Sequence, residues 1–309
     1  MSSPQTFFIT GASGSQGGAV ARKLLASGHK FQALVRDPSK PSSLALQKLG
    51  ATLIHGDYDD IPALQKAATG CTGVFILPVP TQTPGQELEH TQNIIAAAKA
   101  AGIKHAVCST VTRAEESDRF SFTVPENVPV TKYWESKRGL QAAVQNAGFE
   151  TWTILQPAWI MKNWIAPVSH FYFAELKGEK VLVTAFAQDT KIDFTAAEDV
   201  GSFAVKALTE KDSGLEGKIV PIASEGLTIG ESADVMSEVS GVKIGWKLKS
   251  EEDIEKEKNV NPKVATQLWQ RYDGTRVDIE QVKSYGIPLT SFKQFLENNK
   301  EQLLAAVQD

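Results

Sequence analysis

The chain has 309 residues, of which 42% are hydrophobic and 22% charged, as in a globular protein that buries a core. The formal net charge of −4 gives no electrostatic reason to expect a nucleic-acid partner, and two cysteines exclude a disulfide framework. The N-terminus lacks a secretory pattern and no segment has the length of a membrane span. We therefore expect a cytoplasmic protein without a membrane partner.

The first half of the chain alternates apolar runs with segments of helical spacing. Apolar runs predict strands at 6–10, 31–35, 52–55, 74–77, 105–111 and 151–155. Helical spacing predicts helices at 18–27, 44–49, 61–68, 87–101 and 132–146. Continuous apolar strands that alternate with helices are typical of a parallel sheet covered on both faces. We predict an α/β fold with a doubly wound Rossmann sheet in residues 1–158.

The second half has shorter and more irregular elements. Short strands are predicted at 181–183, 192–194 and 218–222, and helices at 197–208, 229–239, 264–272 and 292–307. The charge run 251–258 predicts a solvated helix face. No linker separates the halves, so residues 159–309 are predicted to form a smaller α+β substrate lobe packed on the sheet's carboxyl edge. Segments of this lobe could return to the Rossmann sheet.

A glycine-rich turn follows the first predicted strand. It consists of Gly11, Ala12, Ser13, Gly14, Ser15, Gln16 and Gly17. Glycines at these positions allow a tight turn, close approach of the backbone to a pyrophosphate, and close contact of helix and strand. The helix N-terminus that follows favours negative charge. The turn therefore predicts a dinucleotide site.

The end of the second predicted strand bears on the choice of cofactor. Arg36 is the first residue after the strand, and Lys40 adds a second cation. An Arg here accommodates a 2′-phosphate, whereas an acidic residue holds the ribose 2′-hydroxyl of NAD. Asp37 keeps NAD open if the strand ends one residue later, and both cations could be ordinary surface charges. We predict NADP(H).

Five segments together resemble the NmrA-like family of atypical short-chain dehydrogenase/reductases. They are 10–18, 35–40, 56–60, 136–137 and 191–201, and the resemblance extends over nearly the whole chain. It implies an adenine site at Asp57 and Tyr58, a ribose site at Leu77, Pro78 and Val79, and a nicotinamide site at Pro157, Ala158, Trp159 and Ile160. It also implies that Lys137 holds the nicotinamide ribose. Asn163 resembles the family's asparagine after that loop, with one extra residue before it.

A Tyr-x-x-x-Lys pair departs from many members of that family, which lack the tyrosine and act as redox-sensing regulators. Tyr133 and Lys137 lie four residues apart, on one face of a predicted helix. An ammonium there lowers the pKa of a phenol, which can then act as a general acid. Ser109, or the adjacent Thr110, matches the position at which related enzymes place a hydroxyl that orients the substrate. Tyr133 could instead be a core or surface aromatic residue.

Aromatic side chains gather after the sixth predicted strand, where ligands of doubly wound sheets bind. The predicted substrate-binding residues are Trp159, Asn163, Trp164, His170 and Phe171. Such a pocket suits a bulky apolar molecule. The five histidines have no metal-ligand spacing, so no metal site is expected.

Two functions remain open. The first is an NADPH-dependent reductase of a bulky apolar specialised metabolite, which reduces a C=O, C=N or activated C=C bond and could couple reduction to rearrangement or cyclisation of the product. The second is a non-catalytic NADP(H) sensor that binds a protein partner. Tyr133 favours the enzyme.

Overall fold

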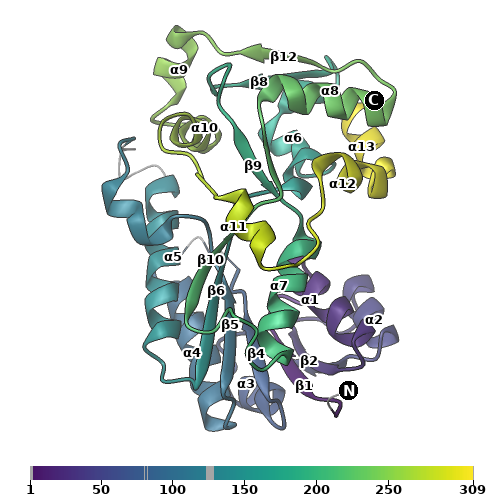
Figure 1. Cartoon of the computed structure of the whole chain (residues 1–309), viewed down its shortest axis with the longest axis vertical. Helices are drawn as coiled ribbons and strands as arrows, with labels where there is room; N and C mark the ends of the chain where they lie inside the picture. The colour runs from purple at the N-terminus through teal and green to yellow at the C-terminus, as the bar shows by residue number, and fades with distance from the viewer. Residues whose placement is uncertain (1–2, 80, 82, 123–128, 309) are drawn as a thin grey trace. The chain divides into compact units, whose positions relative to one another are not determined.

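The computed structural model describes residues 3–79, 81, 83–122 and 129–308, and the side chains of 129–131 are not described (Figure 1). The chain divides into two compact units. Unit 1 comprises Met1–Val111, Ser136–Gln156 and Ala197–Val220, and unit 2 comprises Thr112–Glu135, Pro157–Ala196 and Pro221–Asp309. The two units therefore interleave along the chain.

Unit 1 contains a seven-stranded sheet in the order β10-β6-β5-β4-β1-β2-β3. The strands are β1 (Thr6–Ile9), β2 (Lys30–Val35), β3 (Thr52–His55), β4 (Gly73–Ile76), β5 (His105–Ser109), β6 (Thr151–Pro157) and β10 (Lys218–Ile222). From β3 to β6 the neighbouring strands pair in parallel. This is the strand order of a doubly wound sheet, so the predicted α/β Rossmann fold is confirmed.

Helices cover both faces of this sheet (Figure 1). They are α1 (Ser15–Ala26), α2 (Pro41–Lys48), α3 (Ile61–Ala68), α4 (Gln86–Ala100), α5 (Pro129–Gln145) and α7 (Ala197–Thr209). Buried side chains of α3, α4 and α5 form one apolar cluster with the sheet, which includes Leu64, Ile94 and Val144. Helices α1 and α7 pack together, and a Cβ at Gly201 would lie 3.0 Å from Ala19. Through this packing α7 belongs to unit 1, although the segment before it in the chain, Pro157–Ala196, belongs to unit 2.

Unit 2 is built from short strands and helices. Its strands are β7 (Trp159–Ile160), β8 (Val181–Thr184), β9 (Ile192–Thr195), β11 (Glu225–Leu227) and β12 (Gly245–Leu248). Its helices are α6 (Ser169–Tyr172), α8 (Ile229–Ser240), α9 (Glu251–Glu257), α10 (Pro262–Tyr272), α11 (Ile279–Ser284), α12 (Phe292–Asn298) and α13 (Lys300–Val307). The strands form a three-stranded sheet, β11-β9-β7, and a two-stranded sheet, β12-β8.

Several elements of unit 2 differ from the sequence prediction. Strands β7, β11 and β12, which have two to four residues, were not predicted. The helix expected at 292–307 is two helices, because Asn299 leaves the helical conformation at φ −124° and ψ 35°. None of the helices in the described part of the chain is long and apolar enough to cross a membrane.

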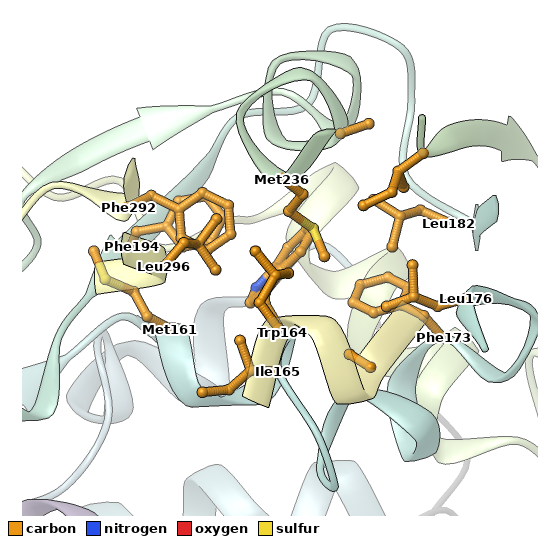
Figure 2. Packing of buried hydrophobic residues seen from close by; sticks show 14 of the residues in the cluster. Met161, Trp164, Ile165, Phe173, Leu176, Leu182, Phe194, Met236, Phe292 and Leu296 are labelled. Carbon is orange, nitrogen blue, oxygen red and sulfur yellow. The ribbon is translucent and has the colours of Figure 1, made fainter. Parts of the chain in front are cut away.

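The core of unit 2 surrounds Trp164, whose side chain is fully buried (Figure 2). Its ring lies 4.8 Å from Phe173, 5.2 Å from Phe194 and 5.6 Å from Phe292, measured between centroids. Trp164, which the sequence analysis predicted to bind substrate, thus lies inside the core of unit 2. Since its neighbours come from β9, α12 and the segment after α6, the ring joins these elements and leaves no surface for a ligand.

Candidate cofactor site and its surroundings

The glycine-rich turn has the stereochemistry of a phosphate-binding turn. Gly11 adopts φ +63°, and its carbonyl accepts a hydrogen bond from the Gly14 N–H at 2.9 Å. A Cβ at Gly17 would lie 2.4 Å from the Gly11 oxygen, so no larger residue fits there. Helix α1 begins at Ser15, and its N-cap Gly14 provides no side-chain cap. The first N–H groups of α1 are thus available to an anion.

A cavity of about 410 Å³ lies beside this turn, at the carboxyl ends of β1 to β4. Its lining combines residues from the turn, from the ends of β2 and β3, and from the start of α4. The lining residues are Gly11, Ser13, Leu34, Val35, Arg36, Asp37, Lys40, Ser42, Ser43, Gly56, Asp57, Tyr58, Asp59, Val79, Thr81, Gln86 and His90. Seven of the predicted cofactor-binding residues are therefore brought together: Gly11, Ser13, Arg36, Lys40, Asp57, Tyr58 and Val79.

The charged residues that follow β2 have different surroundings. Arg36 and Lys40 are exposed and line the cavity. The Asp37 carboxylate instead accepts hydrogen bonds from the Ser39 hydroxyl at 2.6 Å and the Ser39 N–H at 2.9 Å. The hydroxyl bond, followed by the backbone bond, lowers the pKa of Asp37. Its carboxylate is engaged by its own turn, which leaves the two cations to meet a ligand.

Tyr58 connects the end of β3 to the glycine-rich turn. Its hydroxyl accepts a hydrogen bond from the Gly11 N–H at 3.1 Å, and burial raises the pKa of this phenol. Asp57 accepts hydrogen bonds from the N–H groups of Asp59 and Asp60, at 3.0 and 3.1 Å. The first contact holds the Tyr58 side chain against the glycine-rich turn, and the other two hold the loop that follows β3.

Polar residues at the start of α4 were missed by the sequence analysis. Gln86 and His90 both line the cavity, and the His90 Nε2 lies 3.2 Å from an Asp59 oxygen. The His90 ring packs edge-on against Tyr58 with centroids 5.5 Å apart. Their spacing was visible in the sequence, because Gln86 and His90 are four residues apart and such residues lie on one face of a helix.

Ser109 and Thr110, at the end of β5, are engaged by unit 1 itself. The Ser109 side chain is fully buried, and its hydroxyl donates to the Gln16 amide oxygen at 2.6 Å. The Thr110 hydroxyl accepts a hydrogen bond from the Gln141 amide at 2.9 Å. Ser109 thus braces the first turn of α1, and this contact was not foreseen.

Lys137 is buried on α5 and forms an ion pair with Glu87 of α4. The side chains are 4% and 7% exposed, respectively. The other carboxylate oxygen of Glu87 accepts a hydrogen bond from the Ser136 hydroxyl at 2.6 Å. Glu87 was not predicted, because a lone acidic residue in the first turn of a helix is common for reasons of helix dipole alone.

Tyr133 lies four residues before Lys137 on α5, and the division between the units falls between them, at Glu135 and Ser136. Its half-buried ring packs edge-on against Trp134, with centroids 5.4 Å apart. Burial raises the pKa of Tyr172, and electrostatic repulsion from Tyr133 adds to the effect. Tyr133 and Tyr172 both belong to unit 2.

The other residues predicted to bind nicotinamide or substrate lie in unit 2. Trp159 is 8% exposed and packs against Tyr172, with centroids 5.5 Å apart, while Asn163 and His170 are half-buried. Phe171 is 56% exposed, with the Lys263 ammonium 4.9 Å from its centroid. These four predicted residues share a unit with Tyr133. Within the described residues, no three His, Cys, Asp or Glu side chains are grouped as metal ligands.

Comparison with known proteins shows the family. The model of the NmrA-like family matches residues 3–304, and the chain belongs to this family. Quinone oxidoreductase 2 of Escherichia coli is 27% identical over 80% of this chain and 78% of its own length. The NmrA-like family domain-containing oxidoreductase himF of Aspergillus japonicus is 29% identical over 53% of this chain, which matches about half (49%) of that protein.

Solved structures of low sequence identity share the fold. Triphenylmethane reductase of Citrobacter sp., crystallised with NADP(H), is 22% identical with a TM-score of 0.75, over 95% of this chain and 99% of its own. NmrA, a negative transcriptional regulator crystallised with NADP, is 17% identical with a TM-score of 0.73, over 97% of each chain. The fold therefore occurs in a reductase and in a transcriptional regulator.

Proposed function

We propose that this chain is an NADPH-dependent reductase of a bulky apolar molecule. The observation that carries the proposal is the unit 1 cavity, where a glycine-rich turn and two exposed cations line one space. Membership of a family that includes named oxidoreductases supports it. The reducible bond is a C=O, C=N or activated C=C bond.

The residues of the cavity fit NADP(H). The first turn of α1, without a side-chain cap, would receive the pyrophosphate, and Gly17 leaves the backbone open for its approach. Arg36 and Lys40 would hold the 2′-phosphate, because the Asp37 carboxylate is already bound by Ser39. Asp57 and Tyr58 would face the adenine. When bound, the cofactor supplies a hydride to the substrate.

The protein supplies orientation and a proton. Lys137 would bind the nicotinamide ribose, and Tyr133 would donate its phenolic proton to the substrate atom that gains negative charge. We assign Ser109 to bracing α1 rather than to the substrate, because its hydroxyl donates to Gln16.

Aromatic residues of unit 2 favour a bulky apolar substrate. The Tyr172 ring packs against both Trp159 and the exposed Phe171. His170 precedes Phe171 in the chain and is half-buried. The names of two relatives, a quinone oxidoreductase and a triphenylmethane reductase, describe reduction of molecules of this kind. We extend the proposal to specialised metabolites, whose reduced products could rearrange or cyclise where the pocket orients them.

Turnover tests the proposal. Purified protein with NADPH and a panel of quinones, imines and triphenylmethane dyes should oxidise the cofactor with at least one of them. Tyr133→Phe should then lower kcat by about 100-fold or more, the usual contribution of a general acid. Unchanged turnover in Tyr133→Phe would remove this residue from the mechanism.

A sensor of NADP(H) is the second candidate, favoured by the fold shared with NmrA. Such a protein would bind NADP⁺ tightly, turn over none of the panel and associate with a protein partner. The two candidates therefore differ in turnover, while both require the same cofactor cavity.

A further inference from the structure

An exposed aromatic ring and an ammonium without a counter-charge lie together in unit 2. The Phe171 ring, on the short helix α6, is 56% exposed, and the Lys263 ammonium lies 4.9 Å from its centroid. Among the residues that the structure describes, no carboxylate forms an ion pair with this ammonium. Single exposed rings are common on protein surfaces, so the ring is informative only together with the cation and with the polar groups near it.

Helix stability does not explain the position of Lys263. It is the second residue of α10, whose first turn holds no acidic side chain, and a helix dipole disfavours a cation at this end. The Asn261 side chain already accepts a hydrogen bond from the Lys263 N–H at 3.1 Å. The half-buried ammonium, and not the helix end, is therefore the group that is left to meet an anion.

Buried polar atoms without partners gather at α6. Ser169 and His170 precede Phe171 on this helix, and the Trp159 ring packs against its last residue, Tyr172. The described residues offer no hydrogen-bond partner to three buried atoms here: Ser169 Oγ, His170 Nε2 and Trp159 Nε1. Buried polar atoms are normally paired, so each such atom requires an explanation. Because the Trp159 N–H can only donate, its missing partner is an acceptor.

We propose that these groups form a subsite for the acidic substituent of an aromatic substrate. The substrate's ring lies against Phe171, and its carboxylate or sulfonate binds the Lys263 ammonium. The inference rests on the proposed function, because it names the class of molecule that the reductase accepts: an apolar aromatic body with one acidic group. Lys263 determines specificity in this proposal and takes no part in hydride or proton transfer.

Two anthraquinones of the same shape and different charge test the proposal. They are anthraquinone-2-carboxylate and the neutral anthraquinone-2-carboxamide, and the ratio of their dissociation constants measures recognition of the charge. With NADP⁺ present, we expect wild-type protein to bind the carboxylate about tenfold more tightly, as one charge-assisted hydrogen bond would give. The preference should shrink between about 50 mM and about 500 mM salt, because a pair near the surface is screened. Titration calorimetry measures these constants without requiring turnover.

Substitutions of Lys263 assign the preference to this residue. Lys263→Met keeps an unbranched apolar side chain but removes the charge, so the ratio should fall to near one. Lys263→Arg keeps the cation and should retain the preference for the carboxylate. The matched control is Lys256→Met on α9, which removes an exposed ammonium paired with Glu252 and should leave the ratio unchanged.

The outcomes separate this inference from the proposed function. Equal binding of the two anthraquinones by wild-type protein, or binding of neither, would overturn the inference and leave the reductase proposal to the turnover assay. A preference for the carboxylate that persists in Lys263→Met would also overturn it, because the cation assigned to the acidic group is then absent. Charge-dependent binding through Lys263, without oxidation of NADPH by any compound of the panel, would overturn the proposed function and not the subsite.

Discussion

The cofactor cavity of unit 1 and the aromatic core of unit 2 use their side chains in opposite ways. The cavity is made mainly of backbone, small residues and polar groups at strand ends, and its charged residues Arg36 and Lys40 are exposed. The core is made of large aromatic and aliphatic side chains that fill the space around Trp164 (Figure 2). In the cavity, small residues leave space for a ligand. In the core, large side chains fill the space between elements.

This difference predicts how each region fails when changed. An added methyl group should be most harmful in the glycine-rich turn, whereas a removed ring should be most harmful in the core. A change in the cavity should alter ligand binding more than stability, and a change in the core should do the reverse.

Gly17→Ala should have the largest effect on cofactor binding. The new Cβ would lie 2.4 Å from the Gly11 oxygen and 2.8 Å from the Thr10 oxygen, so the turn must open. We expect NADP⁺ binding to weaken by at least about 100-fold, since each N–H bond to an anion contributes about 1.5–3 kcal/mol. Titration calorimetry checks the expectation. The control Gly139→Ala, within α5 and with its nearest contact at 3.7 Å, should bind normally.

The stereochemical requirements of unit 1 explain why its fold and its glycine-rich turn could be predicted from the sequence. Residues at Gly11, Gly14 and Gly17 are restricted by the backbone, so their pattern indicates the turn directly. The continuous apolar strands likewise indicated a sheet buried on both faces. Contacts between distant segments, such as Ser109 with Gln16 or Lys137 with Glu87, leave no comparable pattern in one sequence.

Unit 2 was predicted less well, because an aromatic residue serves equally as core or as pocket wall. Trp164 and Phe171 lie seven residues apart in the same apolar segment, yet one is fully buried and the other is 56% exposed. Packing against Phe194 and Phe292, both far along the chain, decides the difference. Residue type alone contains no information on those partners.

Trp164→Ala tests the core side of the comparison. Loss of a fully buried ring should lower the free energy of unfolding by about 3–5 kcal/mol, through lost burial and the cavity left behind. Denaturant titration measures the change. Trp246→Ala, which removes a ring that is 39% exposed, should cost clearly less. Equal losses in the two variants would contradict the placement of Trp164 at the centre of the core.

Arg36→Ala should have an intermediate effect, confined to the cofactor. Loss of a charge-assisted contact to the 2′-phosphate should weaken NADPH binding by about 10- to 100-fold, which corresponds to about 1.4–2.8 kcal/mol. NADH has no 2′-phosphate, so its binding should change little. The matched control is Arg22→Ala, which removes an exposed guanidinium paired with Glu198 outside the cavity lining. Equal weakening for NADPH and NADH would contradict the assigned role of Arg36.

Phe171→Ala should have the smallest effect on stability and separates two uses of aromatic residues within unit 2. Its exposed ring contacts the Lys263 ammonium, an interaction that contributes about 0.5–1 kcal/mol at a surface. We expect the free energy of unfolding to fall by no more than that amount. If the ring instead covers substrate, KM for the best compound of the panel should rise by up to about tenfold, since partial burial of a phenyl ring contributes about 1 kcal/mol. A rise in KM without a loss of stability would identify Phe171 as a wall of the substrate site, and an unchanged KM would restrict that site to the more buried rings around Trp159.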